Sequence, residues 1–212
     1  MTPEEYIALR DRLHQAGYTK EILWCETVGP PKFPLQFFME YAWVVLNSGM
    51  KNQVAENIWH RVLDALMFKG WQVDAVFRHS GKSKAIQNAW DNQESLFQEF
   101  STKPADELLD WLQALPWIGP ITKYHLAKNL GMDVCKPDRH LMRIAAKYEL
   151  TPEELCASLA RETGNRIGTV DYVLWRAANL GIINFRGQIV NDSPGMATAP
   201  RVSGHKAEGK NC

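Results

Sequence analysis

The sequence predicts an all-α protein of about ten helices. Apolar residues recur at helical spacing along most of the chain, and prolines or capping residues open many of the apolar segments. The 212 residues are 45% hydrophobic and include eight tryptophans and eight phenylalanines, enough for one large core or two small helical lobes. No apolar run approaches the ~20 residues that span a membrane. The acidic N-terminus also lacks a signal core, so we expect a cytoplasmic protein without a membrane partner.

The first half of the chain alternates helical segments with breaker clusters. Thr2 can cap a first helix, which is followed by Gly17. Glycine and prolines at 28–34 indicate a loop. Asn52 is expected to cap a later helix whose inner face begins with Val54. The helices expected in this half span 3–16, 35–46, 53–68 and 83–90. Residues 73–77 fit a short helix or a loop, and residues 91–101 fit either a continuation of the helix at 83–90 or a new helix.

The second half follows the same pattern. Thr151 precedes a proline and two acidic residues, the signature of a capped helix start. Residues 182–190 fit a short strand or a coil, and 191–212 are polar and rich in small residues, which predicts a disordered tail. The helices expected in this half span 103–115, 120–130, 138–148, 152–163 and 169–180.

The four cysteines are widely spaced and form no C-x-x-C pair. This argues against a zinc site and gives no support to a disulfide framework. We expect free thiols in a reducing cytoplasm, no metal site and no cofactor. The cysteines are Cys25, Cys135, Cys156 and Cys212.

Charge is balanced over the chain but not along it. The formal net charge is zero, whereas residues 116–150 hold six basic and three acidic residues. A local basic patch on a neutral protein fits a nucleic-acid footprint. It also fits an ordinary solvated face, and charge alone leaves both interpretations open.

Within this basic region, residues 112–131 predict two helices joined by a tight turn. Gly119 allows a positive φ and the close approach of another backbone. The first N–H groups of the second helix can bind a phosphate oxygen, with Lys123 and Lys128 adding charge. Such contacts position DNA without reading its sequence. Any αα-hairpin also needs a glycine at its turn, so this segment alone does not establish DNA binding.

Two motifs together resemble the helix–hairpin–helix DNA glycosylase superfamily, which contains endonuclease III and the adenine and alkylpurine glycosylases. Leu115-Pro-Trp-Ile-Gly119 is similar to its hairpin L-P-G-[IV]-G, and Asp138-Arg-His-Leu-Met-Arg143-Ile to the V-D-x-H-[IVL]-x-R-[IV] that follows about twenty residues later. Weaker similarity lies at 46–50 and 80–86. The likeness covers roughly residues 35–182 and implies a two-lobed helical fold.

Three positions depart from the family pattern. Trp117 replaces the first glycine of the hairpin, which should alter the turn and place an indole where it packs or touches the sugar–phosphate. Ile121 stands where lyase-competent members have a lysine, and Lys123 is displaced by about 200° around the helix. The four closely spaced cysteines of the iron–sulfur branch are missing, so we expect no cluster.

The resemblance implies that Asp138 is the catalytic carboxylate. Cleavage of an N-glycosidic bond builds positive charge on the deoxyribose, which a carboxylate stabilises while orienting water. Asp138 also fits a simple helix cap, and both roles can coexist. Without a lysine at 121 we expect a monofunctional enzyme, with Lys123 and Lys136 as outside candidates for an amine nucleophile.

The remaining site residues follow from the family positions. Asp171 resembles a segment near the base pocket, although an exposed helix aspartate is the simpler interpretation. We expect Arg143 to brace its helix. Aromatic candidates for the pocket wall, most of them expected in the core, are Trp24, Phe33, Phe37, Phe38, Trp43 and Trp175. The predicted DNA-binding residues are Trp117, Gly119, Ile121, Thr122, Lys123 and His140, and the candidates for a duplex wedge are Met50, Lys51 and Asn52.

The expected function is excision of a damaged or modified base from double-stranded DNA by a monomeric glycosylase. It would be nucleoid-associated in a bacterium, or in the host cytoplasm if viral. Two alternatives stay open: a non-catalytic DNA-binding protein of this fold, and an enzyme acting on hypermodified bases of viral DNA. The expected divisions are an N-terminal helix and loop at 1–34, a glycosylase-like domain at 35–190 and a tail at 191–212.

Overall fold

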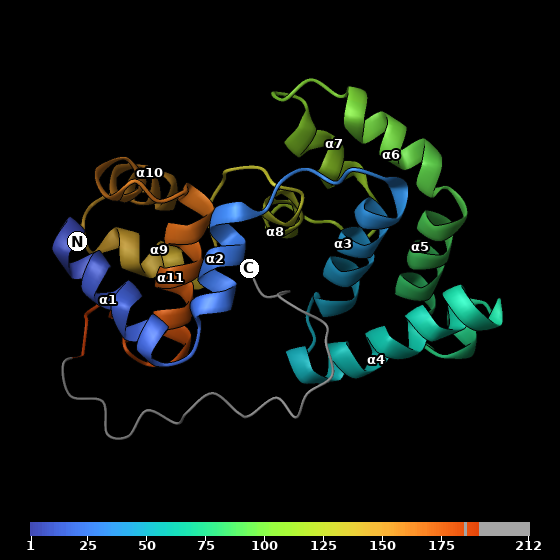
Figure 1. Ribbon diagram of the computed structural model, residues 1–212, viewed down its shortest axis with the longest axis horizontal. Helices are drawn as coiled ribbons and strands as arrows, with labels where there is room; N and C mark the ends of the chain where they lie inside the picture. The colour runs from blue at the N-terminus through green and yellow to red at the C-terminus, as the bar shows by residue number, and fades with distance from the viewer. Residues whose placement is uncertain (185, 191–212) are drawn as a thin grey trace. The chain divides into compact units, whose positions relative to one another are not determined.

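The computed structural model describes residues 1–184 and 186–190, so the predicted tail lies outside the described residues (Figure 1). Within the described ranges the chain forms eleven α-helices, one π-helix and one 3-10 helix. Extended pairing there is limited to an isolated antiparallel bridge between Ile183 and Ile189. These findings confirm the predicted all-α class. No helix in this part of the chain is long and apolar enough to cross a membrane.

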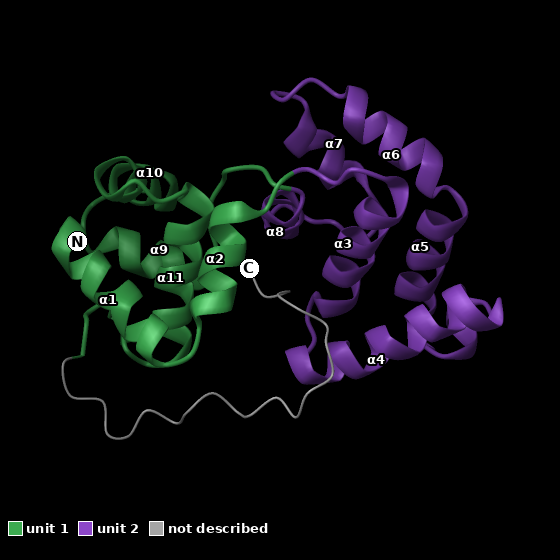
Figure 2. Cartoon of the chain, viewed as in Figure 1, with its two compact units in different colours: residues 1–29, 131–212 green, residues 30–130 purple. Residues whose placement is uncertain are grey.

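The chain divides into two compact units (Figure 2). Unit 1 combines residues 1–29 with 131–212, and unit 2 is the continuous segment 30–130. The sequence-based division instead separated residues 1–34 from a domain at 35–190. The difference arises because the N-terminal helices bury apolar side chains against helices from the other end of the chain.

Unit 1 is built around its last helix, which contacts each of the other four helices of the unit. The first helix buries Tyr6, Leu9 and Leu13 in the core formed with these helices. The second helix was not predicted, because its N-cap residue Tyr18 makes no side-chain cap bond, yet it buries Ile22. The five helices are α1 (Pro3–Gln15), α2 (Thr19–Thr27), α9 (Arg139–Ala146), α10 (Pro152–Thr163) and α11 (Ile167–Asn179).

The chain passes between the two units twice, and the unit 1 ends of both connections are bound by the same arginine, which also pairs with an aspartate. The chain leaves unit 1 after Gly29 and returns at Gly131. The Arg166 guanidinium donates to the Val28 carbonyl at 2.6 Å and to the Gly131 carbonyl at 2.7 Å. Asp133 lies 3.7 Å from the same guanidinium and accepts the N–H of Gly168 at the start of α11. One side chain therefore fixes both ends of unit 1 from which unit 2 departs.

Unit 2 is built around the apolar helix predicted at 35–46. This helix packs against four other helices of the unit, and its Phe37 and Phe38 lie fully in the core. The helices of the unit are α3 (Pro34–Asn47), α4 (Asn52–Asp64), α5 (Ser80–Asp91), α6 (Gln93–Thr102), α7 (Leu108–Ala114) and α8 (Thr122–Asn129), with a π-helix at Ala65–Lys69 and a 3-10 turn at Val73–Ala75.

Two details of unit 2 differ from the predictions. Asn52 is the first residue of α4 and does not cap it; Lys51 takes the N-cap position without a side-chain bond. Val54 is therefore exposed and is not part of the inner face. The helix predicted from residue 103 begins only at Leu108, because Glu107 N–H bonds to the Pro104 carbonyl in a preceding turn.

Candidate active site and DNA-binding hairpin

The predicted hairpin forms from α7, a turn at 115–121 and α8. Ile118 N–H donates to the Leu115 carbonyl at 3.1 Å, and the buried Tyr41 hydroxyl donates to the Pro116 carbonyl at 2.8 Å. The Thr122 hydroxyl accepts the Gly119 N–H at 2.6 Å. The Gly119 amide is thus used inside the turn, and the Lys123 N–H donates to the Gly119 carbonyl at 3.0 Å, so the N–H groups that remain for a phosphate are the other ones at the start of α8.

The turn does not use the positive φ that Gly119 allows. The residue with positive φ is Trp117, at +64°, whereas Gly119 is not in the left-handed region. A Cβ on Gly119 would lie 3.7 Å from the Thr122 hydroxyl, an ordinary contact. The left-handed position of this turn is therefore the one where the family has its first glycine. Placing a tryptophan there costs about 1–2 kcal/mol of backbone strain.

Packing of the indole offsets this strain. A Cβ built on Gly81 would come within 2.4 Å of the Trp117 ring, so the ring covers the one residue of the α5 start that has no side chain. The His79 ring meets the indole edge to face at 5.1 Å, and its Nδ1 accepts the Lys82 N–H as the N-cap of α5. Trp117 remains 47% exposed, so the ring packs against the start of α5 while part of it stays accessible, and contact with a sugar–phosphate stays a prediction.

The basic character predicted for the hairpin is weaker than the sequence suggested. Lys128 is only 5% exposed, so it cannot act as a surface cation; it lies on the inner side of α8. Lys123 forms an ion pair with Asp110 at 3.1 Å. The exposed large side chains at the tip are Trp117 and Ile121. The hairpin therefore presents apolar side chains and backbone N–H groups.

A second turn of unit 2 holds the predicted wedge residues. Gly49 has a φ of +68°, Met50 is partly buried, and Lys51 and Asn52 are exposed. The turn is anchored by Lys82 of α5, whose buried ammonium donates to the carbonyls of Leu46, at 3.1 Å, and Ser48. Desolvation lowers the pKa of Lys82 below its ordinary value.

The predicted catalytic residue Asp138 lies in unit 1 as the N-cap of α9. Its Oδ1 accepts the N–H groups of His140, at 2.8 Å, and Leu141, at 3.2 Å. The capping interpretation is thus confirmed, and the catalytic role stays a prediction. The carboxylate is partly buried, and these bonds engage only one of its two oxygens. An oriented carboxylate with one oxygen outside the cap can serve as a base or as a counter-charge.

His140 and Arg143 interact with each other beside Asp138. The Arg143 guanidinium donates to the Arg139 carbonyl at 3.0 Å and lies 3.1 Å from Nδ1 of His140, so it braces α9 as expected. Desolvation lowers the pKa of His140, and the negative charge of Asp138 partly opposes this. The imidazole is therefore neutral at pH 7 and can accept the hydrogen bond from Arg143.

The simpler sequence interpretation of Asp171, an exposed aspartate on a helix, was wrong. The side chain is 2% exposed, and its Oδ2 accepts the N–H of Lys136 at 2.8 Å. A sequence signal existed, because Asp171 is flanked by Val170 and Tyr172 in a helix that is apolar on most sides, and such helices are buried. The buried carboxylate therefore holds the loop that leads to Asp138.

The aromatic candidates for a base pocket divide by burial. Trp43 is buried, as are the two core phenylalanines of α3. Phe33 is exposed, and Trp24 and Trp175 are partly buried. The Arg176 guanidinium lies 4.8 Å from the centre of the Trp175 ring. Partly buried or exposed rings are the ones a flipped base can reach, which leaves Phe33, Trp24 and Trp175 as candidates.

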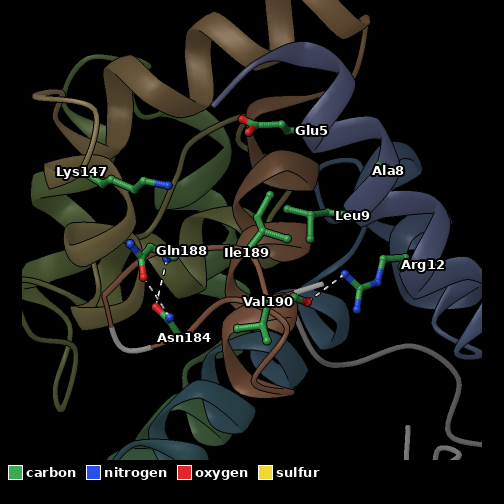
Figure 3. A pocket seen from close by; sticks show the side chains of 9 residues that line it. All are labelled: Glu5, Ala8, Leu9, Arg12, Lys147, Asn184, Gln188, Ile189 and Val190. Carbon is green, nitrogen blue, oxygen red and sulfur yellow. Dashed lines mark hydrogen bonds between the residues drawn. The ribbon is translucent and has the colours of Figure 1, made fainter. Parts of the chain in front are cut away.

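A pocket of about 810 Å³ in unit 1 contains none of the predicted site residues (Figure 3). Its polar groups are engaged with the fold: Arg12 donates to the Val190 carbonyl, and Asn184 bonds to Gln188. No group of three His, Cys, Asp or Glu residues in the described ranges is arranged to hold a metal ion. The lining residues are Glu5, Ala8, Leu9, Arg12, Lys147, Asn184, Gln188, Ile189 and Val190.

The fold is similar to that of a solved glycosylase/lyase. The structure matches the 8-oxoguanine glycosylase/lyase of Methanocaldococcus jannaschii, crystallised in complex with a 15mer DNA containing 8-oxoguanine, with a TM-score of 0.56 and 14% sequence identity. The match covers 85% of this chain and 92% of that chain. No protein-family profile and no curated protein matches the sequence. At this identity the comparison confirms the predicted helical glycosylase fold, and it confirms nothing finer.

Proposed function

We propose that this protein is a DNA N-glycosylase that hydrolyses the bond between a damaged or modified base and its deoxyribose. The observation that carries the proposal is Asp138, a partly buried carboxylate oriented by two backbone N–H groups in a fold similar to that of a glycosylase/lyase. The hairpin with exposed Trp117 and Ile121 supports contact with double-stranded DNA. We expect the protein to act as a monomer.

Asp138 has two roles in this proposal: its negative charge stabilises the positive charge that develops on the sugar, and it accepts a proton from the attacking water. The target nucleotide leaves the stack, and the bond between C1′ and the base nitrogen lengthens until the sugar carries positive charge. The carboxylate stabilises that charge. Because the carboxylate is already oriented before the reaction, little free energy is lost in reorienting it as the charge develops. Water then adds its oxygen to C1′, its proton passes to Asp138, and the base departs with the bonding electron pair.

A lyase step is not part of the proposal. That step needs an amine that attacks C1′ to form a Schiff base. Ile121 occupies the position where lyase-competent members of the resembled family have a lysine, and Lys123 is paired with Asp110. The matched archaeal protein is named a glycosylase/lyase, so this chain should differ from it in leaving the DNA strand intact.

One test does not require knowledge of the base. Duplexes carrying a cationic pyrrolidine abasic-site analogue and a neutral tetrahydrofuran analogue differ by one charge at the sugar. Unit charges about 4 Å apart attract by ~1 kcal/mol in water and ~4 kcal/mol at an effective dielectric of about 20, so we expect the cationic duplex to bind about fivefold to nearly a thousandfold more tightly. Asp138→Asn, which retains a capping side chain, should abolish the preference. Exposed Asp74→Asn is the matched control.

A panel of modified duplexes then identifies the substrate. Alkali-labile abasic sites should appear in one or more duplexes, and Asp138→Asn should slow their formation by at least about a hundredfold. Hypermodified bases of the kind found in viral DNA belong in the panel, because an enzyme acting on such bases is one of the alternatives that the sequence leaves open. If every duplex stays intact and the cationic analogue is not preferred, the proposal fails and a DNA-binding protein without excision is the better description.

A further inference from the structure

Asp171 is an ionisable group in the core of unit 1. It lies on α11 at 2% exposure, between the equally buried Val170 and Tyr172. Placing a carboxylate in such a position is costly unless hydrogen bonds compensate for the lost water. The Lys136 N–H provides one such bond at 2.8 Å. An apolar side chain at this position would fill the core without that cost. The presence of a carboxylate therefore indicates a role other than the packing of α11.

The bonded amide lies two residues before the proposed catalytic carboxylate. Pro137 stands between them and restricts the backbone to a narrow range of φ. The Asp138 N–H turns back to the Lys136 carbonyl at 2.7 Å, which closes a tight turn. Little freedom therefore remains between the amide held by Asp171 and the Cα of Asp138.

The segment 136–138 is consequently fixed at both ends. At one end α11 holds Lys136 through Asp171, and at the other end α9 holds the Asp138 carboxylate through the N–H groups of His140 and Leu141. The cap alone fixes the carboxylate relative to α9. The Asp171 bond fixes the entering backbone relative to α11, which is the central helix of the unit.

We propose that Asp171 is a positioning residue for Asp138, holding its backbone so that the carboxylate oxygen outside the cap meets C1′ of the extruded nucleotide. This rests on the proposed glycosylase function. Asp171 does not touch the substrate in this scheme. A displacement of about 1 Å at a reacting group can lower a rate by about a hundredfold, so loss of the anchor should reduce excision much more than DNA binding.

The test compares Asp171→Ala with Asp171→Asn, whose amide oxygen can still accept the Lys136 N–H. In single-turnover excision, Asp171→Ala should be about a hundredfold slower while the Kd for an undamaged duplex changes less than about threefold. Asp171→Asn should recover most of the rate. Exposed Glu153→Gln on α10 is the control, and thermal unfolding shows which variants are folded at the assay temperature.

A double variant separates positioning from general destabilisation. If Asp171 acts through Asp138, then Asp171→Ala adds little further loss in an Asp138→Asn background. Equal losses in both backgrounds, or a folded Asp171→Ala protein with the wild-type rate, would overturn the positioning role. Preference for the cationic over the neutral abasic analogue should fall in parallel with the rate.

A measurement without DNA keeps the two proposals distinguishable. In NMR spectra, Asp171→Ala should speed hydrogen exchange of the Lys136 amide at least about tenfold and move the carboxyl carbon resonance of Asp138. If wild-type protein excises no base but these changes occur, the glycosylase function fails while the anchoring of Asp138 stands. If excision occurs and both signals stay unchanged, the anchoring fails and the function stands.

Discussion

Replacing Gly81 with alanine tests how the hairpin compensates for its unusual tryptophan. The added Cβ would lie 2.4 Å from Cζ2 and 3.0 Å from Cε2 of Trp117, inside the contact distance of any real pair. The indole is rigid and its backbone is already in the left-handed region, so it cannot yield by a small rotation. We expect either overpacking at the start of α5 or release of the ring into solvent.

Both outcomes have similar magnitudes. Overpacking a well-filled site costs about 1–3 kcal/mol. Since 47% of Trp117 is exposed, roughly half of an aromatic surface of about 150–250 Å² is buried, and at ~25 cal/mol per Å² its release costs about 2–3 kcal/mol. Gly81→Ala should therefore destabilise unit 2 by about 2 kcal/mol. In a Trp117→Gly background the obstacle is gone, and alanine in a helix should instead stabilise by about 0.5–1 kcal/mol.

Urea unfolding of the two single variants, the double variant and the wild type closes this cycle. The expected coupling between the positions is about 3 kcal/mol, far above the ~0.5 kcal/mol seen for independent sites. Tryptophan fluorescence gives a second signal, because release of the indole should shift its emission to the red. If Gly81→Ala costs the same in both backgrounds, the indole does not depend on the missing side chain, and the compensation described for Trp117 is wrong.

Three further predictions concern single residues. Because burial lowers the pKa of His140 below its ordinary value of 6.5, its contribution to stability is present above pH 6.5 and is lost as pH falls through the lowered pKa. The unfolding free energy should thus fall less on acidification in His140→Gln than in wild type, and equal pH profiles would contradict this. Lys82→Met should cost about 1–3 kcal/mol in urea unfolding through two carbonyls left without their donor, whereas exposed Lys84→Met should be neutral; equal costs would show that the anchor of the Ser48 turn is unimportant. Glu149, in the turn that follows α9, has a φ of +57°. Glu149→Gly should therefore raise the free energy of unfolding by about 0.5–1 kcal/mol. A lower urea midpoint for this variant than for wild type would show that the backbone at Glu149 is not strained.

Much of the fold could be predicted because its signals are local. Apolar spacing, caps and breaker residues identified most helices, including α3, α10 and the two helices of the hairpin. Helix α2 escaped because it lacks a side-chain cap and is held by tertiary packing of Ile22 and Cys25. Such packing involves residues far away in the sequence, and no local pattern reveals it. Cys25 is also disulfide-bonded, so the expectation of a free thiol at this position was wrong.

The hairpin and the helix start at Asp138 were predictable from the sequence, but their details were not. The spacing of the hairpin from Asp138 located both motifs, yet the left-handed residue of the turn proved to be Trp117, which no propensity favours. Lys128 counted toward a basic patch on formal charge, although its position on α8 buries it. Asp171 was assigned to the surface because most helical aspartates lie there. In each case the outcome depends on which face of an element meets the core.

The bonds of Arg166 also bear on the order in which the protein takes shape during synthesis. Unit 2 is continuous, so its whole sequence leaves the ribosome before the second half of unit 1 exists. The first helix must keep Tyr6, Leu9 and Leu13 away from foreign apolar surfaces until α11 emerges. Only then can Arg166 reach the Val28 and Gly131 carbonyls and link the two segments of unit 1 to each other. Substitution of Arg166 should therefore slow maturation of unit 1 and leave that of unit 2 unchanged.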